Sequence, residues 1–185
     1  LDLRALLPPG QKAYVAAPMR WCGTMLALKQ QLTGLRPYCA RVICSSYLPD
    51  WRPGVDYRTV YSARKALGGG VTIDLIHEWD YLVDLFGVPE ELYNLRGTYS
   101  ELEIDSDDLS LYIELFCRDG SVVADFGAGT LTLPDGAVQL YEEPVNRRYE
   151  REMEYFVDYA LGDAPASCNP PELALQVLQL TLGEK

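Results

Sequence analysis

The sequence predicts an α+β fold, in which helices pack on one face of a largely antiparallel, open sheet. Two observations predict it. The second half of the chain alternates apolar and polar residues around two turn signals, which is typical of an antiparallel meander. Segments with helical spacing lie before and after that meander. The chain has 185 residues, 48% of them hydrophobic, which suits one domain with a sizeable core.

Strand and helix patterns alternate in the first half. A short apolar run predicts a strand over 13–16, and the spacing of apolar residues predicts a helix over 19–32. Residues 38–47 are rich in β-branched and small apolar residues and lack helical spacing, so they predict a strand buried on both faces. The segment 71–86, between three glycines and Gly87, predicts an amphipathic helix.

The second half predicts strands and then two helices. Residues 109–117 alternate as in a two-faced strand, and Asp119-Gly120 and Asp135-Gly136 predict hairpin turns. A helix is predicted over 147–161, where Gly162 ends it. Another is predicted over 170–182, with Asn169 as its N-cap and Pro170 at its first position.

Charge and cysteine content exclude several classes of protein. Sixteen basic and 27 acidic residues give a net charge of -11, which repels nucleic acid and anionic membranes. No apolar run reaches the ~20 residues of a membrane span, and the first residues resemble no signal peptide. The five cysteines form no Cys-x-x-Cys pair, so we expect reduced, mostly buried thiols in a cytoplasmic protein.

The polar side of the helix 71–86 carries the one histidine of the sequence. Asp74 lies three residues before His77, so on a continuous helix its carboxylate could orient the imidazole for proton transfer. The alternative is a solvated face with an inert histidine. A third interpretation adds Asp80 as a metal ligand of a hydrolase, although Asp74 and Asp80 point in different directions.

Cations and aromatic rings gather around the loop before that helix. They could bind an anionic or hydroxyl-rich ligand, or the cations could pair with acids such as Asp50 and Asp56. The glycines 68–70 lack the spacing of a dinucleotide fingerprint; they are a flexible helix entry or leave room for a ligand. The cations are Arg20, Arg52, Arg58 and Lys65, and the rings are Trp21, Trp51, Tyr57 and Tyr61.

Three segments in fixed order resemble one known family. They read YLPDWRPGVDYR at 47–58, YSA at 61–63 and GGGVTIDLIHEWD at 68–80. Together they resemble the glucose-fructose oxidoreductase/inositol dehydrogenase (Gfo/Idh/MocA) family. The resemblance extends over nearly the whole chain, since Tyr14 to Arg20 resembles the last Rossmann strand with its crossover, and 169–182 resembles the final helix.

The resemblance implies an NAD(P)-dependent dehydrogenase acting on a sugar, polyol or related hydroxy compound. It implies that His77 handles the hydroxyl proton and that Asp74 helps to place the substrate. Asp74 and His77 are one residue closer here than the Asp-x-x-x-His of many members. Residues implied near the substrate cleft are Arg20, Trp51, Tyr57, Arg58 and Lys65.

The resemblance also implies an arrangement of domains. Residues 1–185 correspond to the family's C-terminal substrate-binding and oligomerisation domain, which resembles that of glyceraldehyde-3-phosphate dehydrogenase. Residues 1–17 correspond to the tail of an N-terminal Rossmann domain, which holds NAD or NADP and carries the family's Glu-Lys-Pro segment. The chain alone is then expected to be inactive. A second copy is expected on the open sheet face, as a homodimer or homotetramer. The alternative is a binding or scaffold protein without catalysis.

Overall fold

The computed structural model describes residues 8, 10–44, 47–92, 100–104, 112–117 and 120–183, with the backbone alone for 112–117. The α-helices are α1 (Gly23–Leu32), α2 (Val71–Asp74), α3 (Ile76–Phe86), α4 (Asn146–Leu161) and α5 (Pro171–Leu182). The strands are β1 (Cys39–Ile43), β2 (Tyr112–Cys117), β3 (Gly120–Asp125), β4 (Thr130–Thr132) and β5 (Val138–Leu140). Short 3₁₀ turns are η2 (Pro18–Trp21), η3 (Leu48–Asp50), η4 (Tyr57–Thr59), η5 (Tyr61–Ala63) and η6 (Lys65–Leu67). Among the described helices, none has the length and apolar character needed to cross a membrane.

The sheet is antiparallel throughout, and its strand order follows the sequence from β1 to β5. The predicted meander is therefore confirmed. Cys117 pairs with Gly120, so a two-residue connection joins β2 to β3. Asp119 of the predicted turn lies outside the described residues. The second predicted turn is present, with Gly136 at φ 84° and the Ala137 N–H donating to Asp135 Oδ1 over 2.9 Å.

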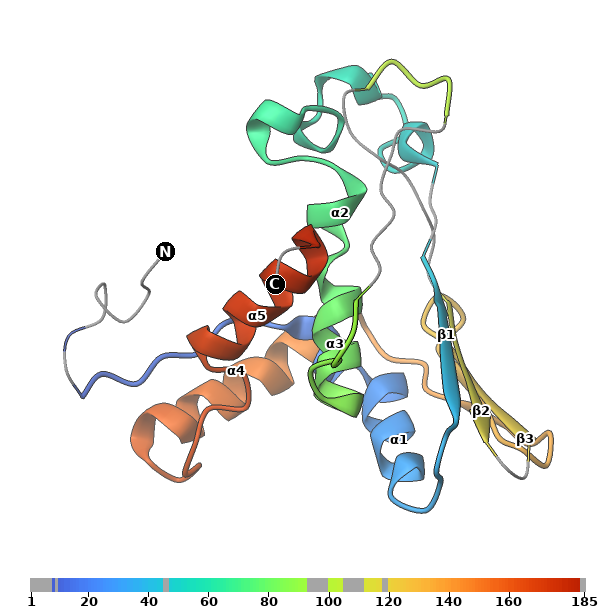
Figure 1. Cartoon of the computed structure of the whole chain (residues 1–185), viewed down its shortest axis with the longest axis vertical. Helices are drawn as coiled ribbons and strands as arrows, with labels where there is room; N and C mark the ends of the chain where they lie inside the picture. Colours follow the sequence, from blue (N-terminus) through green and yellow to red (C-terminus); the bar gives the residue numbers. More distant parts are fainter. Residues whose placement is uncertain are drawn as a thin grey trace.

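The helices lie on one face of the sheet, and the main core lies between the two layers (Figure 1). Met25 and Leu28 of α1 and Tyr81 of α3 pack against inward-facing sheet residues that include Val122 and Leu131. All five of these residues are fully buried. This layered arrangement confirms the predicted α+β fold class.

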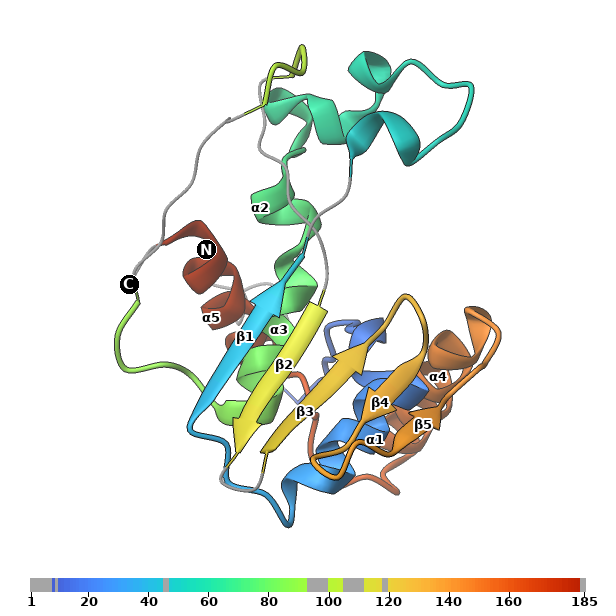
Figure 2. The same cartoon turned by 90° about the vertical axis from the view of Figure 1, so that its right-hand side faces the viewer.

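A second, smaller core joins α3 to α5. Val83 of α3 is buried against Val177 and Leu180 of α5, and the partly buried Ile76 and Trp79 pack on the same cluster. The last helix of the chain thereby fixes the helix that carries the histidine. Both views show α5 beside α3 (Figures 1 and 2).

Two strand predictions need correction. Residues 13–16 form no strand, because the hydrogen bonds of this segment go to helical and loop neighbours: the Val15 N–H donates to the Asn169 carbonyl and the Tyr14 hydroxyl to Glu152. The strand predicted over 38–47 is shorter. Of β1, residues 39–41 and 43 are exposed, because β1 is the edge strand and pairs with β2 alone.

Three helix predictions also need correction. Residues 19–32 divide into η2 and α1, and residues 71–86 divide at Leu75, whose φ of -103° and ψ of 23° interrupt the helix. Asn169 does not cap α5. The helix begins one residue later, after Pro170, because the buried Asn169 side chain donates to the Val15 carbonyl and accepts from Arg20.

Candidate functional site

The three glycines before α2 are required by the backbone itself. A Cβ at Gly69 would overlap the carbonyl of Tyr61, and Gly68 and Gly70 have φ values of 78° and 118°. L-residues rarely adopt such positive φ values. Gly69 is thus a tightly packed point at the entry to α2, and Gly68 and Gly70 supply positive φ angles on either side of it.

The break at Leu75 changes the surroundings of the histidine. Asp74 ends α2, whereas His77 lies in the first turn of α3, so the two residues do not share one continuous helix. The His77 side chain is 35% exposed. In the described part of the chain, the carboxylate that contacts the imidazole is that of Glu78, whose Oε1 lies 2.9 Å from Nε2.

Glu78 is a buried acid with several polar neighbours. Its residue is 7% exposed, and the hydroxyl of Tyr81 donates to its Oε2. The thiol of Cys44, just after β1, lies close enough to this carboxyl group to be affected by its charge. Burial raises the pKa of Glu78, while the contact with His77 opposes that rise.

Sequence reasoning missed Glu78, although one signal pointed to it. Glu78 adjoins the one histidine, and Tyr81 follows one turn later on the same helix. The proximity of Cys44 to Glu78 could not be read from the sequence, because only the fold brings the end of β1 near α3. Burial and the charge of Glu78 raise the pKa of Cys44 to about 12.

Arg20 is a buried structural residue in this fold. It is 2% exposed, and its Nε and Nη2 groups donate to the two carboxylate oxygens of Asp80 over 2.7 and 2.6 Å. Its remaining N–H groups donate to Asp84, the Cys168 carbonyl and Asn169. Burial lowers the pKa of Arg20, but the hydrogen bonds and charge of Asp80, together with the charges of Asp84 and Cys168, more than offset it, so the pKa is raised overall. These contacts leave Arg20 without a donor for a substrate.

The ion pair with Arg20 also argues against Asp80 as a metal ligand. Both oxygens of this carboxylate already accept hydrogen bonds from Arg20. A search of the described residues for three clustered His, Cys, Asp or Glu side chains that could hold an ion finds none. Within the part of the chain that the structure describes, no geometry supports the hydrolase interpretation.

The loop residues predicted to bind substrate lie apart from the sheet. The segment from η3 to η6 lies beyond the N-terminal end of α2 (Figure 1). There the partly exposed Arg58 pairs with Asp56 and Glu103, and its guanidinium lies 5.0 Å from the ring centroid of Tyr57. Arg58 therefore forms ion pairs with nearby acids, as the second interpretation of the loop cations predicted. Trp51 is 38% exposed and lines a small recess with Tyr57, and Lys65 is exposed.

The thiols are less buried than the sequence suggested. Cys22, Cys39, Cys44 and Cys168 are free, but Cys39 and Cys168 are exposed. Cys39 is exposed because it begins the edge strand β1. Burial raises the pKa of Cys22 as well as that of Cys44.

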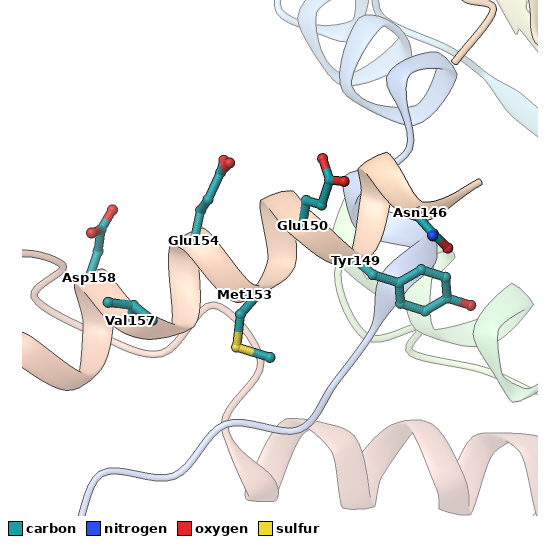
Figure 3. A pocket seen from close by; sticks show the side chains of 7 residues that line it. All are labelled: Asn146, Tyr149, Glu150, Met153, Glu154, Val157 and Asp158. Atoms are coloured by element: carbon teal, nitrogen blue, oxygen red, sulfur yellow. The ribbon is translucent and has the colours of Figure 1, made fainter. Parts of the chain in front are cut away.

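An open groove of about 890 Å³ runs along α4. Tyr149, Met153 and Val157 form its apolar side, and Glu150 and other acids point away from them along the helix (Figure 3). None of the site residues predicted from the sequence lines this groove. It also has no contact with His77 and Glu78, which lie on α3.

Comparison with known proteins identifies the fold. No protein-family model matches the sequence, and no curated protein matches it. The crystal structure of D-galactose-1-dehydrogenase from Rhizobium etli superposes with a TM-score of 0.68 over 98% of this chain, at 17% sequence identity. The chain has the fold of this dehydrogenase. It spans 62% of the dehydrogenase chain.

The D-galactose-1-dehydrogenase belongs to the Gfo/Idh/MocA family, so the resemblance read from the sequence and the fold found in the structure agree. At 17% identity the match concerns the fold alone. It covers α2, α3 and the surrounding sheet, because nearly the whole chain is included.

Proposed function

We propose that this chain is the substrate-side domain of an NAD(P)-dependent oxidoreductase that acts on a sugar, polyol or related hydroxy compound. The observation that carries the proposal is the match of 98% of the chain to a sugar dehydrogenase fold, combined with a histidine at the start of α3. Fold alone does not determine function, so the proposal depends on what His77 can do.

His77 supplies the chemistry in this proposal. A histidine changes its protonation state near neutral pH and is the side chain most often used for general acid–base catalysis. His77 is 35% exposed, so its ring is accessible, and the contact with Glu78 restrains one of its two ring nitrogens. Its role is to exchange a proton with the hydroxyl group of the substrate. Asp74, in the turn before, is proposed to help place that substrate.

The glycine triplet does not have the form of a dinucleotide-binding turn. A Cβ at Gly69 would overlap the backbone of Tyr61, and the sequence holds no dinucleotide fingerprint. We assign NAD or NADP binding to a Rossmann domain outside this chain. The 38% of D-galactose-1-dehydrogenase that the match leaves uncovered is consistent with that assignment, since the match covers 62% of its length.

Among the loop residues, we retain Trp51, Tyr57 and Lys65 as candidate substrate contacts. Aromatic rings can stack on a sugar face, and Trp51 remains partly exposed. We also keep Arg58 as a candidate substrate contact, because it lies beside Tyr57. A ligand would have to displace Asp56 or Glu103 from its guanidinium. Arg20 is left out, because its N–H groups are all engaged.

We also propose that the chain pairs with another copy of itself. Ile43, Val138 and Leu140 are 42, 63 and 61% exposed, and no described helix covers the sheet face toward the viewer in Figure 2. Apolar side chains left exposed on an open sheet face form a surface that a partner can cover. We therefore assign this face to a homodimer or homotetramer interface.

The test is a substrate panel with the full-length protein. D-galactose and other aldoses, together with polyols such as myo-inositol, are incubated with NAD⁺ or NADP⁺, and formation of the reduced nicotinamide is followed by absorbance. Turnover of at least one hydroxy compound supports the proposal. Cofactor binding without turnover across the panel would favour a binding or scaffold protein, and absence of cofactor binding would reject an NAD(P) enzyme.

A further inference from the structure

Glu78 occupies the position beside His77 that the sequence assigned to Asp74. The interruption at Leu75 places Asp74 on α2 and His77 on α3. The carboxylate oxygen of Glu78 lies 2.9 Å from His77 Nε2. A residue adjacent in sequence thus makes the contact that was expected from one a helical turn away.

Glu78 is itself held by other side chains. The Tyr81 hydroxyl donates to Oε2 from one turn further along α3, and the Cys44 thiol, just after β1, is close enough to be affected by the charge of the carboxyl group. Only 9% of the Glu78 side chain is exposed, so water hardly competes for these contacts. A carboxylate that is fixed in this way can fix the imidazole in turn, as an orienting third group does for a catalytic base.

We infer that Glu78 is the positioning residue of His77: it holds Nε2 and leaves Nδ1 as the atom that exchanges a proton. Its relevance to catalysis rests on the function proposed above. In that function the hydroxyl O–H bond of the substrate breaks and an Nδ1–H bond forms. While Glu78 is ionised, its carboxylate can only accept hydrogen bonds, so Nε2 keeps its own proton in that state.

The single histidine of the chain allows a direct test by NMR. In the chain labelled at histidine, the ring C–H order parameter reports on mobility and the Nε2–H signal reports on the contact with Glu78. We expect wild-type order near the rigid value of about 0.85, and a fall below about 0.6 in Glu78→Ala with loss of the Nε2–H signal. Glu78→Gln should keep the signal, because its amide oxygen still accepts.

Asp74→Ala is the matched control, since it removes the other carboxylate in the same region. It should leave ring order and the Nε2–H signal unchanged. An ordered ring in a folded Glu78→Ala variant, or a mobile ring in Asp74→Ala, would overturn the inference. These results do not depend on turnover, so an inactive protein with an ordered, Glu78-dependent ring would reject the proposed function and leave the positioning role intact.

Tyr81→Phe provides a second variant in case Glu78→Ala does not fold. It retains the ring that packs against Phe126 and removes the hydroxyl that donates to Glu78. Loosening Glu78 should accelerate exchange of the Nε2 proton with water by about tenfold. An unchanged exchange rate in a folded Tyr81→Phe variant would contradict the inference.

Discussion

At the residue scale, the pair of Arg20 and Asp80 is a buried, two-point ionic contact. Two charge-assisted hydrogen bonds join the planar guanidinium to both carboxylate oxygens, and Asp84 and Asn169 bond to the same guanidinium. The pair ties η2 to α3 and to the segment before α5. Its function is to hold these three segments together.

Arg20→Met should destabilise the protein by about 3–5 kcal/mol, because it leaves Asp80 as an unpaired buried charge. Urea denaturation measures the loss. Adding Asp80→Leu should recover most of it, because the charge is then removed as well. Arg58→Met, which breaks an exposed pair, serves as control and should change stability little. Equal losses in the two single variants would show that burial of Arg20 is unimportant.

Sequence reasoning found His77 but not its surroundings. Residue type and the absence of any other histidine singled out His77. The burial of Asp80 and Glu78 could not be predicted, because helical spacing placed Asp80 on a polar face that the fold covers with Arg20. A charge on a polar face and a charge in a buried ion pair have the same sequence pattern.

At the scale of elements, the entry to α2 depends on close backbone packing. Gly69→Ala should lower the free energy of unfolding by about 1–3 kcal/mol, because the added methyl group would overlap the Tyr61 carbonyl. Denaturant titration checks this. Gly34→Ala is the matched control, since a Cβ there has an ordinary contact with Gln31, and it should be nearly neutral. Similar losses for both variants would mean that the packing at Gly69 is not tight.

The junction of α1, β5 and α4 should respond to acid. Glu143 accepts hydrogen bonds from Arg151 and from the N–H of Gly23 at the start of α1, and the hydrogen bonds from Arg151 are the main reason that the pKa of Glu143 is lowered. A lowered pKa in the folded state contributes stability that is present above the ordinary value of 4.5 and is lost as pH falls through the lower, folded value.

The melting temperature of Glu143→Gln should therefore approach that of wild type as pH falls from about 7 to about 3. At neutral pH the variant should melt lower, because it lacks the ionised contact with Arg151. Glu150→Gln, in an exposed pair with Arg147, should give a curve parallel to that of wild type. A constant difference between Glu143→Gln and wild type across the range would contradict the assigned role of Glu143.

Helices and the meander were predictable because apolar periodicity and turn residues report on local structure. The helices predicted at 147–161 and 170–182 lie within one residue of α4 and α5 at each end. The interruption at Leu75 involves neither glycine nor proline, so it left no sequence signal. The missing strand at 13–16 depends on which neighbours receive its hydrogen bonds, and only the tertiary fold determines that.

At the scale of the whole molecule, the open sheet face should govern assembly. Val138→Lys places a charge among exposed apolar residues of β5 and should shift the full-length protein toward monomer, as measured by light scattering after size exclusion. Met153→Lys is the control, because Met153 on α4 is similarly exposed, at 59% against 63% for Val138. A monomeric wild type, or dissociation by Met153→Lys alone, would reject the sheet face as the interface.

The fold class could be predicted because the order of elements restricts the possible layers. Antiparallel hairpins with flanking helices leave few arrangements other than helices on one sheet face. The spatial relation of the loop 47–70 to α3 could not be predicted, because it depends on the glycine entry and on contacts such as Arg58 with Glu103. The backbone of nearly the whole chain also superposes on that of D-galactose-1-dehydrogenase, in agreement with the predicted fold class.

The turnover of His77→Ala in the full-length protein tests the central claim most directly. Loss of a general acid–base group should lower turnover by about 10²-fold or more with the substrate found in the panel. The dissociation constant of the nicotinamide cofactor should stay the same, because that cofactor is assigned to another domain. Turnover equal to wild type would contradict the account, since the proton transfer assigned to His77 would then be made by another group.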